Sequence, residues 1–216
     1  MGMILTAEHA MRRRRPPIAR YLTVALLLGS LTQFASAGLV YAKAWLAPLL
    51  IERAFIASQQ RHAVVRPWPW ADTWPVARLQ VPRLSLQRHV LAGDSGEALA
   101  FAAGMAPQVR PGDPGLTMIS GHRDTHFRFL SKLQVGDTLS LDHEDQRIHY
   151  RITDRVVADA RDGLIDAVLP ARGLLLVTCY PFDALVPGGP GRFVVVAEQI
   201  GNEALSLVDR GDAMLR

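Results

Sequence analysis

The stretch Ala77-Arg78-Leu79-Gln80-Val81 alternates apolar and polar side chains, which is the pattern of a strand with one buried face. The alternation returns in Leu84-Ser85-Leu86-Gln87. Short helices are expected only at 97–103 and 127–133. About seven strands with so few helices predict an all-β fold, a closed or nearly closed barrel rather than a parallel doubly wound sheet. The other expected strands are short apolar runs bounded by Gly, Pro and Asp, at 116–120, 138–141, 148–157, 174–178 and 193–197.

The composition fits one folded domain and narrows the classes of function. The chain has 216 residues, of which 49% are hydrophobic and 20% charged, enough to build a core without disulfides. Its single cysteine excludes an intrachain disulfide and any multi-cysteine metal site. Residues 1–66 carry nine Lys/Arg against two Asp/Glu, whereas residues 67–216 carry fifteen against eighteen. Because the excess of basic residues belongs to the N-terminal end, we expect no nucleic-acid partner.

Residues 21–42 contain no charged side chain and are bracketed by Arg20 and Lys43. A helix of this length spans about 30 Å, the thickness of a bilayer core. The basic segment 1–20, which includes a run of four arginines, favours the cytoplasmic side. These features predict a single-pass protein of the cytoplasmic membrane, with its body in the periplasm or outside the cell. The alternative is a signal peptide cleaved near Ala35-Ser36-Ala37, which would export the same body.

The segment between the membrane helix and the first strand divides into two parts. Residues 43–60 have helical patterning and predict a juxtamembrane extension. Pro67-Trp68-Pro69-Trp70 and Trp74-Pro75 then interrupt that pattern and indicate a linker. We therefore expect a basic N-terminus at 1–20, a membrane helix at 21–42, a helix and linker at 43–75, a barrel at 76–200 and a tail at 201–216.

Two residues at predicted strand ends form a candidate nucleophile and base. Cys179 follows the apolar run 174–178, and Pro181 stops strand pairing after it, so the sulfur can be exposed. His122 ends a similar run, and the preceding Gly121 permits close approach of backbone or substrate. A thiol needs such a partner because only the thiolate attacks, and histidine can hold the thiolate and protonate a leaving amine.

Arg192 begins the apolar run 193–197 after a loop rich in glycine and proline. An arginine at the mouth of a site can stabilise an oxyanion through charge-assisted hydrogen bonds. Taken singly, Cys179, His122 and Arg192 also fit ordinary structural roles, a buried thiol, a polar histidine and a salt-bridged arginine.

The three residues together resemble the sortases, which are membrane-anchored cysteine transpeptidases. The resemblance covers about residues 76–198 and rests on His122 in Ile-Ser-Gly-His-Arg, Cys179 in Leu-Val-Thr-Cys-Tyr and Arg192 in Gly-Arg-Phe-Val-Val, in that order. The flanking segments 111–115, 121–127 and 133–137 also fit. The continuation Arg-Asp-Thr-His-Phe is most similar to class D and class C sortases, and the set also resembles the sortases of Gram-negative proteobacteria.

This resemblance implies a closed eight-stranded β-barrel and a mechanism. Cys179 would attack the Thr–Gly bond of a C-terminal sorting signal similar to Leu-Pro-x-Thr-Gly on an exported protein. His122 would protonate the leaving amine and then deprotonate the incoming one, while Arg192 would hold the oxyanion. Thr178 would help to place the substrate. The acceptor amine is left open between peptidoglycan, a pilin lysine and water.

Other functions stay open at this level. With water as acceptor, the chain would be a membrane-anchored cysteine endopeptidase. A non-catalytic anchored β-barrel that binds a partner would leave Cys179 inert. A zinc site built on His122 and His126 would need a helix across a strand-to-loop junction. The acidic group Asp142, Glu144 and Asp145 is interpreted as a solvated hairpin turn, so we assign no metal and no cofactor.

Overall fold

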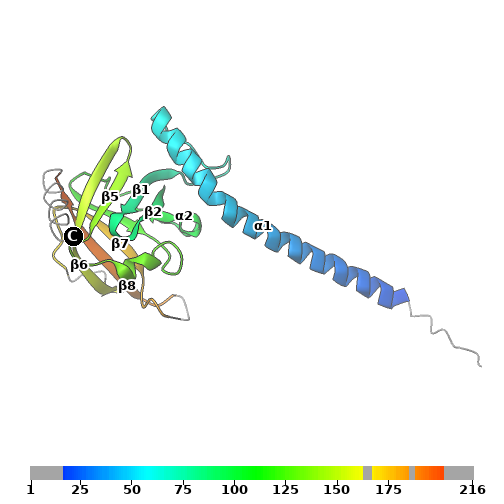
Figure 1. Ribbon diagram of the computed structural model, residues 1–216. Coiled ribbons are helices and arrows are strands. Elements are labelled where there is room, and N and C mark those ends of the chain that lie inside the picture. The colour runs from blue at the N-terminus through cyan, green and yellow to red at the C-terminus, as the bar shows by residue number, and fades with distance from the viewer. Residues whose placement is uncertain (1–16, 163–166, 185–187, 202–216) are drawn as a thin grey trace, which may run out of the picture. The chain divides into compact units, whose positions relative to one another are not determined.

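The computed structural model describes residues 17–162, 167–184 and 188–201 (Figure 1). The chain divides into two compact units, Met1–Trp45 and Leu46–Arg216. The predicted tail after Gly201 and most of the predicted basic segment 1–20 lie outside the described residues.

One long helix, α1 (Pro17–Arg61), runs through both the expected membrane segment and the expected juxtamembrane helix. Within it, Ile18–Gly38 is long and apolar enough to cross a membrane, and its side chains are exposed. The hydroxyls of Thr23, Ser30 and Thr32 donate hydrogen bonds to backbone carbonyls three or four residues earlier, at 2.8 to 2.9 Å. These polar groups are satisfied inside the helix, as an apolar surrounding requires.

The second unit contains a closed barrel of eight strands, in the order β1-β2-β3-β4-β7-β8-β6-β5. Antiparallel pairing of β1 with β5 closes it, while β4 and β7 run parallel. The predicted closed eight-stranded all-β barrel is therefore confirmed. The strands are β1 (Pro75–Val81), β2 (Leu86–Ala92), β3 (Ala103–Met105), β4 (Gly115–Ser120), β5 (Thr138–His143), β6 (Gln146–Asp159), β7 (Arg172–Cys179) and β8 (Gly191–Ile200).

Short helices connect some of the strands: α2 (Gly96–Phe101), η1 (Pro82–Leu84) and η2 (Arg128–Lys132), the last two being 3₁₀ turns. The expected helices at 97–103 and 127–133 are thus present with shifted ends. The strand expected from Leu84 to Gln87 is wrong in its first half. Pro82 lacks an N–H and begins the 3₁₀ turn, and β2 starts only at Leu86.

Side-chain alternation builds two apolar layers from the same strands. In β7, Leu174 and Leu176 belong to the cluster that fills the barrel, whereas Leu175 belongs to a second cluster with Val194 and Val196 of β8. Because successive side chains in a strand point to opposite faces, this second cluster lies on the outer face of the sheet. We call this surface the outer apolar face; its other members are Leu116, Met118, Val156, Ala158, Ala167 and Val177.

The last four turns of α1 pack against the barrel within the second unit. Ile51 and Phe55 are almost completely buried, and Ile51 shares a cluster with Leu91 of β2. The Phe55 ring lies 5.4 Å from the His89 ring and 5.2 Å from the Arg78 guanidinium carbon. The helical pattern predicted only a juxtamembrane extension here. The buried contacts make this part of the helix a component of the folded domain as well.

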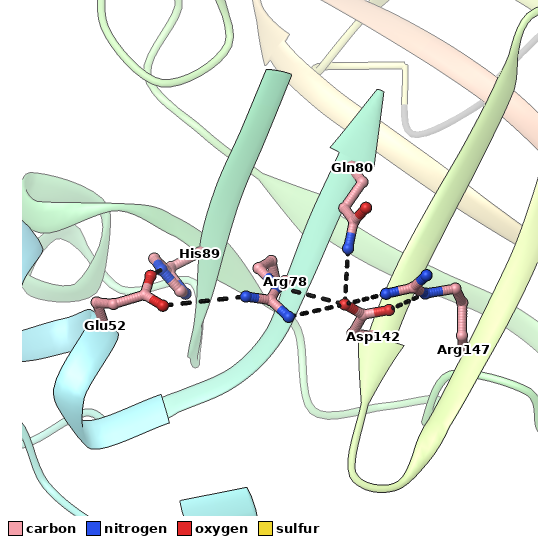
Figure 2. A network of polar contacts seen from close by, with 6 residues as sticks. All are labelled: Glu52, Arg78, Gln80, His89, Asp142 and Arg147. Atoms are coloured by element: carbon pink, nitrogen blue, oxygen red, sulfur yellow. Dashed lines mark hydrogen bonds and ion pairs between the residues drawn. The ribbon is translucent and has the colours of Figure 1, made fainter. Parts of the chain in front are cut away.

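A polar network continues this contact across the strands (Figure 2). Glu52 of α1 lies 2.5 Å from His89 and 3.9 Å from Arg78. Arg78 donates to Asp142 of β5, which also accepts hydrogen bonds from Gln80 at 2.7 Å and Arg147 at 2.6 Å.

The interpretation of the acidic group as a solvated turn is wrong for Asp142. Glu144 and Asp145 occupy the exposed β5–β6 turn, but the side chain of Asp142 is 13% exposed and neutralised by Arg78 and Arg147. Burial favours the protonated acid, yet the hydrogen bonds and charges of the two arginines prevail and lower the pKa of Asp142.

Candidate active site

The pairing of β7 with β8 places Cys179 directly opposite Arg192. Opposed residues of antiparallel strands have Cβ atoms about 4.5–5.5 Å apart on the same face. Cys179 is a free, partly exposed thiol at the end of β7. By alternation with Val177 and Leu175, it lies at the end of the outer apolar face.

The parallel pairing of β4 with β7 brings His122 to the same end. Ser120 is paired with Val177, and the Gly121 N–H donates to the Val177 carbonyl at 3.1 Å. Because β4 and β7 run parallel, His122 follows the end of β4 at the same end of the barrel where Cys179 ends β7. The structure thus gathers all three predicted strand-end residues at one end of the barrel.

Gly121 is required at this junction by packing. A Cβ added there would lie 2.8 Å from the ring of Phe127, which is fully buried. The Phe127 N–H in turn donates to the His122 carbonyl at 3.0 Å. The backbone of His122 is therefore held by β7 on one side and by the buried Phe127 on the other.

Thr178 lies in the interior, on the opposite side of β7 from Cys179. Its side chain is buried, and its hydroxyl donates to the Gly121 carbonyl at 2.7 Å. This bond joins the end of β7 to the end of β4, so the geometry gives Thr178 a contact with the histidine strand.

Arg192 donates from Nη1 to the carbonyls of Gly189 and Gly191, at 2.8 and 2.9 Å. These bonds fix one side of the guanidinium against its own loop. Its positive charge also reaches Asp159 of β6. The pKa of Asp159 falls to about 2, mainly through hydrogen bonds from Arg161 and in smaller part through the charge of Arg192.

An ion pair that the sequence did not single out lies beside these residues. Arg123 is 7% exposed and donates from Nε and Nη2 to both carboxylate oxygens of Asp124, at 2.8 and 3.0 Å. It also donates to the carbonyls of Pro181, at 2.5 Å, and Ala184, at 2.9 Å. The adjacent opposite charges in Arg123-Asp124 are visible in the sequence, but the burial of the arginine against the loop after Cys179 is not.

His126 is half-buried on the other side of His122. Burial lowers the pKa of His126, and the charges of His122 and Arg88 lower it further. A backbone hydrogen bond with Ala100 raises this pKa by less than the other causes lower it. Within the described ranges, no three His, Cys, Asp or Glu side chains are grouped to hold a metal ion.

A cavity of the second unit lies elsewhere. It has a volume of about 630 Å³ and is lined by residues of the last turn of α1, the segment 105–111 and the β5–β6 turn. The lining segment 105–111 starts opposite Ile119 and runs back along β4 to Val109, which lies at Gly115, so the cavity extends away from His122.

Comparison with known proteins identifies the family. The family model for the Sortase domain matches residues 79–200, more than half of the chain. Sortase D of Bacillus subtilis (strain 168) is 28% identical over 124 residues, covering 56% of this chain. The chain matches 62% of the length of that relative.

Two solved structures share the fold at low sequence identity. A Sortase D5 transpeptidase of Clostridium perfringens superposes with a TM-score of 0.54 at 20% identity, over 72% of this chain and 99% of that one. Sortase A from Corynebacterium diphtheriae gives a TM-score of 0.53 at 18% identity, over 61% of this chain and 63% of that one. The match over residues 79–200, more than half of the chain, together with the closed eight-stranded barrel, shows that the chain belongs to the sortase family.

Proposed function

We propose that this chain is a membrane-anchored cysteine transpeptidase of the sortase type, acting on exported proteins at the cell envelope. The observation that supports the proposal is the strand register, which pairs Cys179 with Arg192 and ends β4, just before His122, at the same end of the barrel. A nucleophile, a base and a cation at one strand end are the groups that acyl transfer through a thioester requires.

In the first half-reaction, the Cys179 thiolate attacks the carbonyl carbon of the Thr–Gly bond in a signal similar to Leu-Pro-x-Thr-Gly. The carbonyl electron pair moves to oxygen and forms a tetrahedral oxyanion. When it collapses, the C–N bond breaks and protonated His122 donates its proton to the leaving glycine amine. The target protein is then held as a thioester on Cys179.

In the second half-reaction, an acceptor amine attacks the thioester carbonyl. Neutral His122 takes the proton of the attacking amine, the C–S bond breaks, and Cys179 leaves as the thiolate. The new amide joins the target protein to the acceptor. Water in place of the amine would give hydrolysis and release the cleaved protein.

Arg192 is assigned to the oxyanion. Its Nη1 is bonded to Gly189 and Gly191, and among the described residues Nε and Nη2 carry no hydrogen bond. Those two groups are available to donate to a substrate oxygen beside Cys179. Thr178 contributes to substrate placement by holding Gly121, and so His122, through its hydroxyl.

The outer apolar face suits the apolar part of such a signal. The partly exposed Val177 and Met118 lie on it, toward the end that carries Cys179. Leucine and proline side chains of the signal would be removed from water there, at roughly 25 cal/mol per Å² of apolar surface.

The segment Ile18–Gly38 is proposed as the anchor. With the arginine-rich N-terminus in the cytoplasm, the barrel would face the periplasm or the cell exterior, where exported substrates and acceptor amines are found. Membrane fractionation followed by protease treatment from the outer side tests this orientation. We expect the barrel to be digested and the N-terminal segment to be protected.

The activity is tested with the full chain in detergent micelles, a Leu-Pro-x-Thr-Gly peptide library and a set of amines, followed by mass spectrometry. We expect a ligated product and a thioester adduct on Cys179, both absent in Cys179→Ala. His122→Ala and Arg192→Ala should lower kcat/KM by about 10²–10³. His62→Ala, an exposed histidine paired with Asp145, is the matched control and should retain activity.

The outcomes separate the candidate functions. Cleavage without ligation for every amine would indicate an endopeptidase. Full ligation by both His122→Ala and Arg192→Ala would show that the proposed roles are wrong. A wild-type Cys179 that resists alkylation and forms no adduct would indicate a non-catalytic barrel.

A further inference from the structure

The Arg123–Asp124 ion pair lies in the chain between the proposed base and the loop that follows the proposed nucleophile. Its fork of hydrogen bonds, at 2.8 and 3.0 Å, keeps the two side chains in one arrangement. In the chain it directly follows His122, and in space it contacts the loop that follows Cys179.

The cationic end of the pair lies against the loop that follows Cys179. Arg123 bonds to the carbonyls of Pro181 and Ala184, and a negative charge on Cys179 raises the pKa of Arg123, as does that of Asp183. The hydrogen bonds that Arg123 donates to Asp124 are the largest cause of this increase, and burial opposes it. Because the arginine is 7% exposed, solvent and salt screen its field at the sulfur only weakly.

The anionic end is the exposed Asp124, two residues after His122 in the chain. Hydrogen bonds from Arg123 are the main reason that the pKa of Asp124 is lowered, and positive charges on Arg128 and His122 lower it further. The side chain of Asp124 is 67% exposed, so its field at His122 is screened more than that of Arg123 at Cys179.

We propose that the Arg123–Asp124 pair positions and polarises the catalytic pair: the cation beside the sulfur and the anion beside the imidazole stabilise the Cys179 thiolate together with the His122 imidazolium. In this arrangement, the positive Arg123 is the neighbour of the negative Cys179, and the negative Asp124 is the neighbour of the positive His122. Arg123 also holds the loop 180–184 through its two carbonyl bonds. The role rests on the proposed function, and neither residue exchanges a proton with substrate.

Other charges around the site also act on the Cys179 thiolate and the His122 imidazolium. Arg192, paired with Cys179 across the strands, adds to the field of Arg123, whereas Asp183 opposes it. His126 lies near His122 and disfavours a second positive charge there. The negative charge of Asp124 offsets this repulsion at the imidazolium. In the proposal, the buried Arg123 stabilises the ion pair of Cys179 and His122 more than Asp124 does.

The test measures alkylation of Cys179 by iodoacetamide as a function of pH, with the full chain in micelles. Cys179 is the only cysteine, so the rate reports on this thiol alone. In Arg123→Gln we expect the inflection to move up by about one pH unit, which lowers the rate about tenfold below it. Arg123→Lys keeps the charge and should stay within a factor of about 3 of the wild-type rate.

Asp124→Asn distinguishes the proposal from a simple repulsion of the thiolate. If Asp124 acted on the sulfur directly, its neutralisation would move the inflection down. The proposal predicts that the inflection moves up and the alkylation rate below it falls about threefold, since the imidazolium loses its partner. This variant carries the test if Arg123→Gln does not fold. Hydrogen exchange over 180–184 should increase in both Arg123 variants, because neither keeps the fork.

Arg83→Gln is the matched control. Arg83 makes the same kind of fork, at 2.6 and 2.7 Å, to Asp137 and also bonds to the Lys132 carbonyl. Its loss should leave the alkylation profile unchanged. Superimposable profiles for wild type, Arg123→Gln and Asp124→Asn would overturn the proposal. Alkylation needs no sorting signal, so shifted profiles without ligation would contradict the proposed function and leave this inference standing.

Discussion

At the scale of single residues, the site depends on how tightly the ends of β4 and β7 are joined. Gly121 bonds to Val177 through its N–H, receives the Thr178 hydroxyl on its carbonyl, and packs its Cα against Phe127. These three contacts leave the backbone at His122 little freedom. Small changes at Gly121 or Thr178 should therefore affect both stability and activity.

Gly121→Ala should place a methyl group 2.8 Å from the Phe127 ring. Because Phe127 is fully buried, relief requires movement of the backbone at His122. We expect a loss of about 1–3 kcal/mol in the free energy of unfolding. The accompanying displacement of His122 should lower kcat/KM at least about tenfold.

Thermal unfolding and ligation kinetics check this prediction. Gly96→Ala is the control, since nothing lies within 4 Å of its added Cβ. The double variant Gly121→Ala/Phe127→Leu should recover part of the loss. Wild-type stability and activity in Gly121→Ala would contradict the packing argument.

Thr178→Val removes a buried hydroxyl and preserves the shape of the side chain. The Gly121 carbonyl loses a 2.7 Å hydrogen bond that water cannot replace in the interior. We expect a destabilisation of about 1–3 kcal/mol, measured by thermal unfolding. Thr178→Ser retains the hydroxyl and should lose less ligation activity than Thr178→Val. If the two variants have equal activity, the hydroxyl has no part in positioning.

At the scale of elements, the end of α1 and the strands β1, β2 and β5 form one packed layer. Phe55 and Ile51 supply the apolar contact, while Glu52, Arg78 and Asp142 continue it as a chain of charges (Figure 2). The helical pattern of residues 43–60 is visible in the sequence. That its C-terminal part is covered by strands depends on residues far along the chain, such as Leu91.

Asp142→Asn should remove the anion on which two arginines and Gln80 converge. The side chain is 13% exposed, so the cost of leaving these donors unpaired is about 3 kcal/mol at neutral pH. Because the folded pKa of Asp142 is lowered, its contribution to stability is present above the unfolded pKa, about 3.9, and is lost as pH falls through the folded value.

Unfolding temperatures at pH 7, 5 and 3 measure this difference. The difference in unfolding temperature between wild type and Asp142→Asn should be largest at pH 7 and smaller at pH 3. Asp145→Asn on the same hairpin is the control, since its pair with His62 is exposed and should be worth less than about 1 kcal/mol. An equal gap at all three pH values would contradict the charge argument.

At the scale of the whole molecule, the chain consists of two units with a boundary inside α1. The first reaches Trp45 and contains the candidate membrane span, and the second begins at Leu46 with the turns that pack on the barrel. The folded domain thus starts well before the first strand. This has a direct consequence for where the chain can be cut.

A fragment of residues 46–216 should fold as a soluble, monodisperse barrel. A fragment of residues 62–216 lacks Ile51 and Phe55, which uncovers Leu91. Loss of one buried aromatic side chain alone typically costs about 3–5 kcal/mol. We expect the shorter fragment to unfold at lower temperature and to bind more of a hydrophobic dye. Equal unfolding temperatures would show that the helix contributes nothing to the domain.

The sequence by itself determined the features that local patterns encode. Period-two alternation at 77–81 and the later apolar runs predicted the barrel, and the uncharged stretch 21–42 predicted a candidate membrane helix. The candidate catalytic residues Cys179, His122 and Arg192 were named from their positions at predicted strand ends, and their joint role stays a prediction. The placement among sortase classes stays a prediction from the motif after His122.

Only the tertiary structure decided the features that depend on distant contacts. Thr178 faces the interior, Arg123 is buried under the loop after Cys179, and Asp142 is neutralised in the β1–β5 layer. Each of these side chains is polar, so its sequence pattern alone favours exposure. Burial of a polar group is stabilised only when partners from other strands and loops satisfy its hydrogen bonds, and those partners are brought together only by the fold.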